Sequence, residues 1–291
     1  MKTCLVLGNR GMLGSYLTSY IPRVPDAASW RLAGYDLPDV DIADASSVAA
    51  ILAREKPNLI VNCAAYTNVD KAETERDLAY RVNAAGPEVL ARAAKSSGAL
   101  LVHISTDFIF DGSHPGPYRE DDKPNPLCAY AASKLAGEEA IKAASPEFLI
   151  VRTAWLYGPN GKNFVDSILG LAKEKGRVMV VDDQAGSPTF TAVLSEYLLK
   201  LVLAGARGVY HVAGSGACTW YDLASEAIRI AGITATVTPC TTEEFPRPAR
   251  RPRNSALDVG KAERLLGEEI PNWRNGLRRY LARNYLPAQS Q

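Results

Sequence analysis

Short apolar runs alternate with helix-like stretches over the first half of the chain. Five runs are rich in Val, Ile and Leu at consecutive positions, which is typical of strands buried on both faces of a parallel sheet. They are Thr3–Leu7, Arg31–Tyr35, Leu59–Cys63, Leu100–Ser105 and Phe148–Thr153. The helix-like stretches between them are Met12–Tyr20, Ser46–Lys56, Asp77–Ser96 and Ala129–Ala143. This alternation predicts right-handed βαβ units and an α/β fold with a Rossmann-type, doubly wound parallel sheet.

Beyond residue 157 the apolar runs shorten, and glycine and proline become more frequent. The expected strands are short, for example Val178–Val181 and Gly208–Val212. Helices are expected at Asn163–Glu174, Ala192–Leu203, Trp220–Ala231, Gly260–Leu266 and Trp273–Tyr285. The sequence therefore predicts a dinucleotide-binding Rossmann domain over 1–157 and mainly a smaller C-terminal substrate-binding lobe over 158–291. We expect the chain to return to the first domain around 178–213.

Charge and composition narrow the choice of partner. The 291 residues carry 33 Lys and Arg against 32 Asp and Glu, so no overall field attracts nucleic acid or an anionic membrane. Five cysteines without CxxC spacing and three histidines without metal-ligand spacing predict neither a disulfide framework nor a metal site. No apolar run approaches the roughly 18 residues needed to span a bilayer. We expect a cytoplasmic protein that acts on a small molecule.

A glycine-rich turn connects the first predicted strand to the first predicted helix. Gly8, Gly11 and Gly14 have the spacing GxxGxxG. Glycines there allow a tight turn and close approach of a pyrophosphate, to which the helix N-terminus offers free N–H groups. The strand before the motif and the helix after it are the context that supports a dinucleotide site.

Two residues give opposing indications about the form of the cofactor. Asp36 ends the second strand, where a carboxylate can accept hydrogen bonds from the ribose of NADH and repel the extra phosphate of NADPH. Arg10 lies inside the glycine loop and can pair with that phosphate, unless it is simply a solvated arginine. Asp41, followed by Ile42, is a second candidate on the adenosine side. The sequence is compatible with NADPH or NADH, with NADPH or dual use favoured.

Candidate catalytic groups follow the fourth strand. Thr106 comes at the end of that strand, and Tyr130 and Lys134 lie four residues apart on one face of a predicted helix. A lysine cation beside a phenol favours the phenolate; bringing the pKa from near 10 toward neutrality, roughly three units, needs about 4 kcal/mol. We therefore expect Tyr130 to exchange a proton with a carbonyl or alcohol oxygen that Thr106 polarises.

At this point the sequence resembles the extended short-chain dehydrogenase/reductases and, within them, the dTDP-4-dehydrorhamnose reductases. The resemblance covers nearly the whole chain. The segments that carry it are Gly8–Gly14, Val61–Glu73, His103–Gly112, Tyr130–Glu138, Arg152–Gly158, Asp183–Thr189 and Arg251–Leu257. It implies an oxidoreductase that reduces the 4-keto group of dTDP-4-dehydro-L-rhamnose with NAD(P)H to give dTDP-L-rhamnose, a precursor of cell-surface polysaccharide.

The resemblance also assigns residues to roles. Thr106, Tyr130 and Lys134 form the catalytic triad, with Tyr130 as proton donor and Lys134 also holding the nicotinamide ribose. The cofactor is implied to contact Gly11, Met12 and Leu13 through its pyrophosphate and to be flanked by Ala64, Ala65, Tyr66 and Thr67. The substrate is implied to meet Thr106, Asp107, Phe108, Trp155, Gln184, Thr189, Arg251 and Asn254.

Several of these assignments compete with plainer readings. Trp155 could be a core tryptophan that closes the sheet edge. Gln184 and Thr189 belong to a segment that could be only a turn. Arg251 belongs to a cluster with Arg247, Arg250 and Arg253, which could be a solvated charged loop.

Two further alternatives concern the activity itself. One is a related nucleotide-sugar reductase or epimerase that forms a 6-deoxytalose or GDP-fucose product. The other is a non-catalytic NADP-binding regulatory subunit of the same fold. Some members of the family dimerise through magnesium held by acidic side chains, one of them at the position of Tyr16 here. Tyrosine offers no carboxylate, so we expect no metal and a monomer or weak homodimer.

Overall fold

A six-stranded parallel sheet forms the centre of the molecule. The computed structural model describes residues 1–145 and 147–285. The strand order is β10-β5-β4-β3-β1-β2, and all the pairings are parallel. The strands are β1 (Thr3–Leu7), β2 (Arg31–Tyr35), β3 (Leu59–Asn62), β4 (Leu100–Thr106), β5 (Phe148–Thr153) and β10 (Gly208–His211). The predicted doubly wound Rossmann sheet is confirmed.

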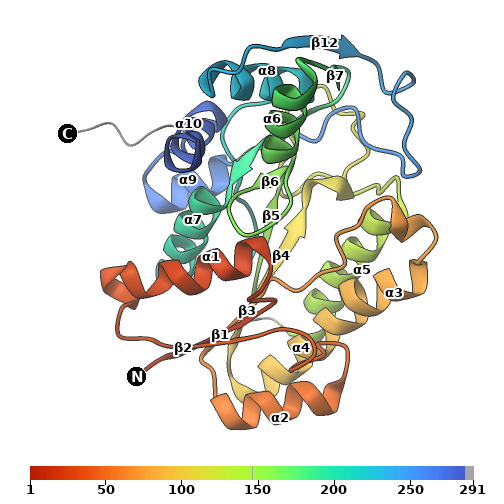
Figure 1. The fold of residues 1–291 in the computed structure, drawn as a ribbon. Helices are drawn as coiled ribbons and strands as arrows, with labels where there is room; N and C mark the ends of the chain where they lie inside the picture. Colours follow the sequence, from red (N-terminus) through yellow and green to blue (C-terminus); the bar gives the residue numbers. More distant parts are fainter. Residues whose placement is uncertain (146, 286–291) are drawn as a thin grey trace.

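Helices cover both faces of this sheet, as Figure 1 shows. Helices α1 (Met12–Tyr20) and α7 (Thr191–Leu203) pack together on one face. The other face carries α2 (Ala45–Glu55), α4 (Gly86–Ser97) and α5 (Ala129–Ala144). The side chains of β1 alternate between two apolar cores, with Cys4 and Val6 in one and Leu5 and Leu7 in the other. This period of two explains why the strand is apolar at every position.

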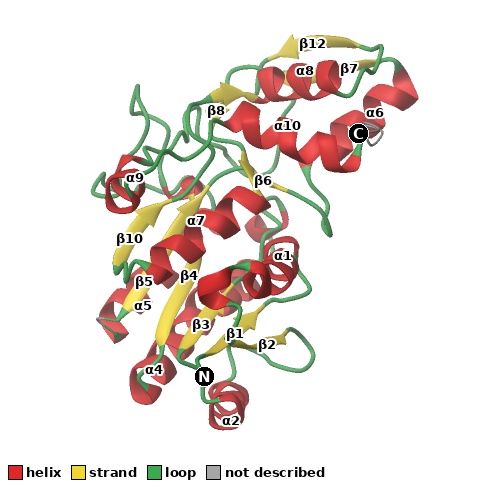
Figure 2. Cartoon of the chain, turned by 90° about the vertical axis from the view of Figure 1, so that its left-hand side faces the viewer, coloured by secondary structure: helices red, strands yellow, loops and turns green. Residues whose placement is uncertain are grey.

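A smaller lobe lies beyond one end of the sheet, at the top of Figure 2. It contains α6 (Phe164–Lys175), α8 (Trp220–Ile230) and a parallel pair of β7 (Arg177–Val181) with β12 (Thr236–Cys240). Within residues 178–213, β10 is a strand of the main sheet and α7 packs beside α1 on one of its faces. Strand β7 pairs with β12 and belongs to the lobe. Helices α9 (Gly260–Leu266) and α10 (Trp273–Asn284) complete the chain as far as it is described.

The helix expected at Asp77–Ser96 is divided into three parts. Helix α3 (Arg76–Tyr80) is followed by a π-helical segment over Arg81–Ala85 and then by α4. Asn83 in this segment is buried; its Oδ1 accepts from the backbone N of Tyr66 at 2.8 Å, and its Nδ2 donates to Ser133 Oγ at 3.0 Å. A uniform helical pattern in the sequence does not reveal these long-range hydrogen bonds, so the single-helix prediction was wrong at this point.

Short or exposed strands were also missed. β12 is largely exposed and contains Pro239, so it lacks the apolar run by which the other strands were recognised. The two-residue strands β6 (Leu156–Tyr157), β8 (Ala185–Gly186), β9 (Thr189–Phe190) and β11 (Cys218–Thr219) depend on pairing between distant segments. Over the described ranges, no helix is long and apolar enough to cross a bilayer.

Candidate active site

A cavity of about 720 Å³ is lined by residues of the sheet edge and of the smaller lobe. This volume is in the range usual for small-molecule sites. The glycine loop after β1 and the residues at the ends of β4 and β5 contribute to its wall. Parallel strands bring their carboxyl ends to one edge of the sheet, and ligands of this fold bind outside that edge. The cavity therefore lies where the sheet topology favours a ligand.

The glycine loop is packed too closely for side chains. A Cβ on Gly8, whose φ is +76°, would lie 2.6 Å from the backbone N of Ala64. A Cβ on Gly14 would lie 2.1 Å from the carbonyl O of Gly8. Gly11 precedes α1, and none of the described side chains caps this helix, so the N–H groups of its first turn are left without a side-chain acceptor beside the cavity. This cradle fits the pyrophosphate of a dinucleotide, as the sequence predicted.

A second cavity of about 180 Å³ continues from the glycine loop along the ends of β1, β2 and β3. Its wall includes the predicted cofactor residues Gly8, Gly11, Asp36, Asp41, Ile42, Ala64 and Ala65. Arg10 lies beside it: the Arg10 backbone N donates to Asp36 Oδ2 at 3.1 Å, and the guanidinium donates to the Leu37 carbonyl at 2.9 Å. The acidic and basic candidates are thus adjacent at the end of β2, where the adenosine ribose of a dinucleotide would lie.

Thr106, Tyr130 and Lys134 converge on the larger cavity. Thr106 ends β4, and the other two residues lie one turn apart on α5. The ring of Phe108 meets that of Tyr130 edge-on at 6.1 Å between centroids. The predicted triad is therefore assembled in one place, together with the start of α1.

The electrostatics of Tyr130 differ from the expectation. Burial raises the pKa of Tyr130, a hydrogen bond with Thr106 partly opposes this, and Asp107 raises it further. The Lys134 amine lies elsewhere: Nζ donates to the carbonyl O of Ile104 at 2.7 Å and contacts His103 Nε2 at 3.1 Å. Lys134 is not among the groups that shift the pKa of Tyr130 in the protein without cofactor, and its amine is directed to these two groups.

Asp107 is an unusual carboxyl at this position. Its side chain is buried, and Oδ1 accepts from Thr106 Oγ1 at 3.0 Å. Oδ2 has no hydrogen-bond partner among the residues that the structure describes. Burial raises the pKa of Asp107 to about 7, and the hydrogen bond with Thr106 opposes this only in part. Near neutral pH this cavity wall can therefore carry a protonated carboxyl.

An aromatic wall faces the triad from the lobe. Trp155 has a φ of 44°, in the left-handed region, and its ring stacks on Trp220 at 3.5 Å between centroids with an interplanar angle of 4°. A Cβ on Gly186 would lie 2.3 Å from the Trp155 ring, so glycine leaves room for the indole. Trp155 lines the cavity, and Trp220 and Lys162, which the sequence did not single out, line it as well.

The other predicted substrate residues are placed unevenly. Arg251 lines the cavity and is anchored by a two-point contact to Asp70, with Nη1–Oδ1 at 3.0 Å and Nη2–Oδ2 at 3.1 Å. Gln184, Thr189 and Asn254 do not line it: their polar atoms bond to Thr242, to Ser187 and Gly214, and to the carbonyls of His114 and Gly116. Thr67 lines the cavity, whereas the Tyr66 hydroxyl donates to Glu75.

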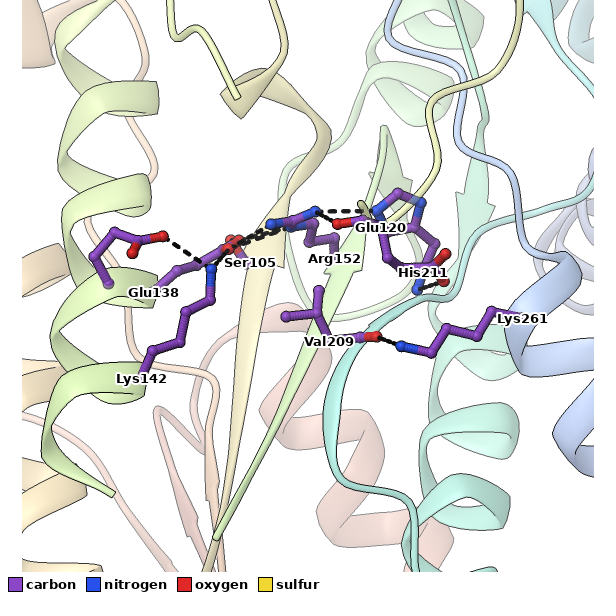
Figure 3. Close-up of polar contacts among 9 residues, drawn as sticks. Ser105, Glu120, Glu138, Lys142, Arg152, Val209, His211 and Lys261 are labelled. Atoms are coloured by element: carbon purple, nitrogen blue, oxygen red, sulfur yellow. Dashed lines mark hydrogen bonds and ion pairs between the residues drawn. The ribbon is translucent and has the colours of Figure 1, made fainter. Parts of the chain in front are cut away.

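Behind the triad lies a buried charged network, shown in Figure 3. Arg152 of β5 donates to Glu138 of α5 through Nη2 at 2.7 Å and Nε at 2.9 Å, and Ser105 Oγ donates to the same carboxylate at 2.5 Å. Arg152 also reaches His211 Nε2 at 3.4 Å. Glu138 is one turn after Lys134, so this network fixes α5 against β4 and β5.

The described side chains include no group of three or more His, Cys, Asp or Glu residues placed to hold a metal ion. The polar side chains that line the cavity include those of Thr106, Asp107, Tyr130, Lys134 and Arg251.

Comparison with known proteins agrees with this geometry. Residues 1–286 match the family model described as the RmlD substrate binding domain. The chain is 42% identical over 280 residues to a dTDP-4-dehydrorhamnose reductase of Streptomyces griseus, covering 94% of this chain and 91% of that protein. The dTDP-4-dehydrorhamnose reductase of Bacillus anthracis, solved in complex with NADP, superposes with a TM-score of 0.93 at 39% identity, covering 98% and 100% of the two chains. The Clostridium acetobutylicum structure of that description gives a TM-score of 0.91 at 42% identity over 96% and 98%. The chain belongs to the RmlD family of dTDP-4-dehydrorhamnose reductases.

Proposed function

We propose that this protein reduces the 4-keto group of dTDP-4-dehydro-L-rhamnose with NADPH or NADH, giving dTDP-L-rhamnose. The observation that supports it most directly is the convergence of Thr106, Tyr130 and Lys134 on one cavity with the uncapped start of α1. A reduced nicotinamide cofactor bound there supplies the hydride. The protein's own residues supply the rest: they hold the substrate oxygen, provide its proton and exclude water.

Tyr130 is the proton donor in this proposal. Burial raises its pKa, so the phenol remains protonated near neutral pH, which is the form that donates to a carbonyl oxygen as it gains charge. Thr106 is positioned by its hydrogen bonds to Asp107 Oδ1 and from the backbone N of Phe108. A protonated Asp107 can donate to Thr106 Oγ1 and so leave the hydroxyl proton of Thr106 free to polarise the substrate carbonyl.

NADPH is the cofactor we expect to be used more efficiently. The B. anthracis relative is described in complex with NADP, and Arg10 lies beside the end of β2, where an extra ribose phosphate can meet a guanidinium. Asp36 is adjacent, however, and its Oδ2 is held by the backbone N of Arg10. NADH use at a lower rate is compatible with this arrangement.

The aromatic wall and Arg251 are proposed to hold the nucleotide sugar. Trp155 presents a flat apolar ring to a deoxysugar, and its stacking on Trp220 fixes the orientation of that ring. Arg251 offers a guanidinium, pre-oriented by Asp70, for the diphosphate. These groups line the same cavity as the glycine loop and the triad, so cofactor and substrate can meet there.

A coupled assay tests the proposal. The keto sugar is generated in situ from dTDP-glucose, and oxidation of NADPH and of NADH is followed separately for the wild type and Tyr130→Phe. We expect dTDP-L-rhamnose as product, with at least a hundredfold loss in the variant, since general acid catalysis contributes roughly 10²–10⁴. A 6-deoxytalose product would contradict the stereochemistry. Unimpaired cofactor binding with no oxidation would favour the regulatory-subunit alternative.

We also propose that the protein is a monomer or weak homodimer. Tyr16 is engaged within its own chain: its ring packs edge-on against Phe190 at 6.2 Å, and its hydroxyl accepts from Arg283 at 3.3 Å. Sedimentation equilibrium with and without magnesium tests this, and a magnesium-dependent dimer would contradict it.

A further inference from the structure

A chain of buried hydrogen bonds leads from the end of β3, through Asn62 and His103, to Lys134. Asn62 at the end of β3 and His103 in β4 are register partners, and both side chains are 1% exposed. Asn62 Nδ2 lies 3.1 Å from His103 Nδ1, and His103 Nε2 lies 3.1 Å from Lys134 Nζ. Lys134 is itself 2% exposed. His103 therefore separates two polar groups, and each of its ring nitrogens faces one of them.

The direction of the chain is set at its start. Asn62 Oδ1 accepts from the backbone N of Ala64 at 3.1 Å, which orients the amide and leaves Nδ2 as the donor toward His103. His103 Nδ1 must then accept and carry no proton. A neutral imidazole has one N–H, so the proton is on Nε2 and points at Lys134 Nζ.

We propose that His103 is a positioning residue for Lys134: fixed by Asn62 in the Nε2–H form, it donates to Nζ and favours the uncharged amine. An ammonium group has three donors and no lone pair, so it would oppose the His103 N–H at 3.1 Å. The neutral amine can accept this hydrogen bond while it donates to the carbonyl O of Ile104 at 2.7 Å.

The other groups around Lys134 do not reverse this preference. Burial lowers the pKa of Lys134 to about 8, against a raising influence from Glu138 on the same helix and from Cys63 after β3. The Glu138 carboxylate is itself occupied by Arg152 and Ser105. Burial holds the pKa of His103 well below its usual value, so the ring stays neutral.

His211 provides an internal comparison within the same protein. Its Nδ1 lies 3.1 Å from the carbonyl oxygens of both Tyr118 and Asp258, and its Nε2 lies 3.4 Å from Arg152 Nη1, which can only donate. His211 must therefore carry its proton on Nδ1. The two buried histidines of this three-histidine chain are expected to be opposite tautomers.

The first experiment is ¹⁵N NMR of the cofactor-free protein labelled at histidine, because the shift distinguishes protonated from bare ring nitrogens. His103→Gln and His211→Gln variants assign the signals. We expect His103 neutral with the proton on Nε2, and His211 neutral with the proton on Nδ1. At pH 9, above the pKa of Lys134, a His103 proton on Nδ1 or a doubly protonated ring overturns the proposal.

The second experiment measures the ionisation midpoint of Lys134 from its ¹³Cε shift, with Lys134→Met as the assignment control. Asn62→Asp places an acceptor against Nδ1, so the His103 proton moves to Nδ1 and the midpoint of Lys134 rises. The substitution also adds a charge, so it is repeated in a His103→Leu background. A rise that is much larger when His103 is present supports the proposal, and an equal rise in both backgrounds overturns it.

The consequence for turnover rests on the proposed function, because a charged Lys134 would favour the phenolate left on Tyr130 after proton donation. The rate of the reaction should then fall on the alkaline side, at the pH at which Lys134 loses its charge. Both NMR measurements use protein without cofactor or substrate. They therefore stand or fall independently of whether the keto sugar is reduced.

Discussion

The Arg152–Glu138 pair offers a quantitative test of what holds the catalytic helix in place. The carboxylate accepts Nη2 at 2.7 Å and Nε at 2.9 Å, and both side chains are almost completely buried. Glu138→Leu would leave the guanidinium with two neutral acceptors, the Glu120 carbonyl at 3.2 Å and His211 Nε2 at 3.4 Å. An uncompensated buried charge of this kind costs about 3–5 kcal/mol in the free energy of unfolding.

Removing both charges should cost less than removing one. Arg152→Met alone strands the carboxylate, with Ser105 Oγ as its remaining close donor and Lys142 at 3.7 Å. In the double variant Glu138→Leu/Arg152→Met neither charge of the pair remains, and apolar replacements of buried ion pairs are often neutral or stabilising. We expect the double variant to recover at least about 2 kcal/mol relative to Glu138→Leu, a coupling typical of contacting residues.

Urea unfolding at pH 7.5, followed by far-UV circular dichroism and tryptophan fluorescence, measures these differences. Burial raises the pKa of Glu138, but Arg152, Ser105 and Lys142 together lower it by more, so the carboxylate is ionised at this pH. Arg92→Met is the matched control, because the Arg92–Glu88 pair is exposed and worth under about 1 kcal/mol. If the two single losses simply add in the double variant, the pair does not stabilise the helix in the way argued.

Three further predictions concern the site itself. The raised pKa of Asp107 makes the folded state keep a proton that the unfolded state loses, so the free energy of unfolding should fall between pH 4 and 7, by up to about 4 kcal/mol for roughly three units. Asp107→Asn should flatten this fall. Parallel pH profiles of the two proteins in thermal unfolding would contradict this. Arg10→Ala should raise KM for NADPH about tenfold or more while changing that for NADH less than about twofold, since a charge-assisted hydrogen bond is worth about 1.5–3 kcal/mol; equal losses in steady-state assays would refute the phosphate role. Gly186→Ala should displace Trp155 and lower kcat/KM for the sugar up to about a hundredfold with the cofactor Kd unchanged, whereas Gly170→Ala, which meets nothing within 4 Å, should leave both unchanged.

Local patterns in the sequence were sufficient for the cofactor half of the molecule. Strands β1, β3 and β5 are buried at nearly every position, so their apolar runs mark them within a residue of their observed ends. The glycine spacing and the Tyr130–Lys134 spacing are set by a single turn and a single helix. Features of this kind depend on neighbours in the chain, and they can be read without knowing the fold.

The substrate half depends on contacts between distant segments, which no local pattern reveals. Trp220 reaches the cavity because it stacks on Trp155, which lies 65 positions earlier in the chain. Asn83 divides a helix because its amide is committed to Tyr66 and Ser133. In the same way, Gln184 and Asn254 read as free polar groups in the sequence but hold loops of the lobe together in the structure.

His103 and Lys134 show why the same limit applies to electrostatics. The spacing of Tyr130 and Lys134 places both residues on one face of α5, from which a direct effect of the amine on the phenol was expected. In the structure, Lys134 Nζ instead points to β4, where it contacts His103 Nε2 and donates to the carbonyl O of Ile104. How one ionisable group shifts the pKa of another depends on the hydrogen bonds that each makes with its other partners. Here it depends on the Asn62 amide, which is oriented by the backbone N of Ala64. Residues that lie behind the reacting groups therefore set the charge state with which those groups begin the reaction.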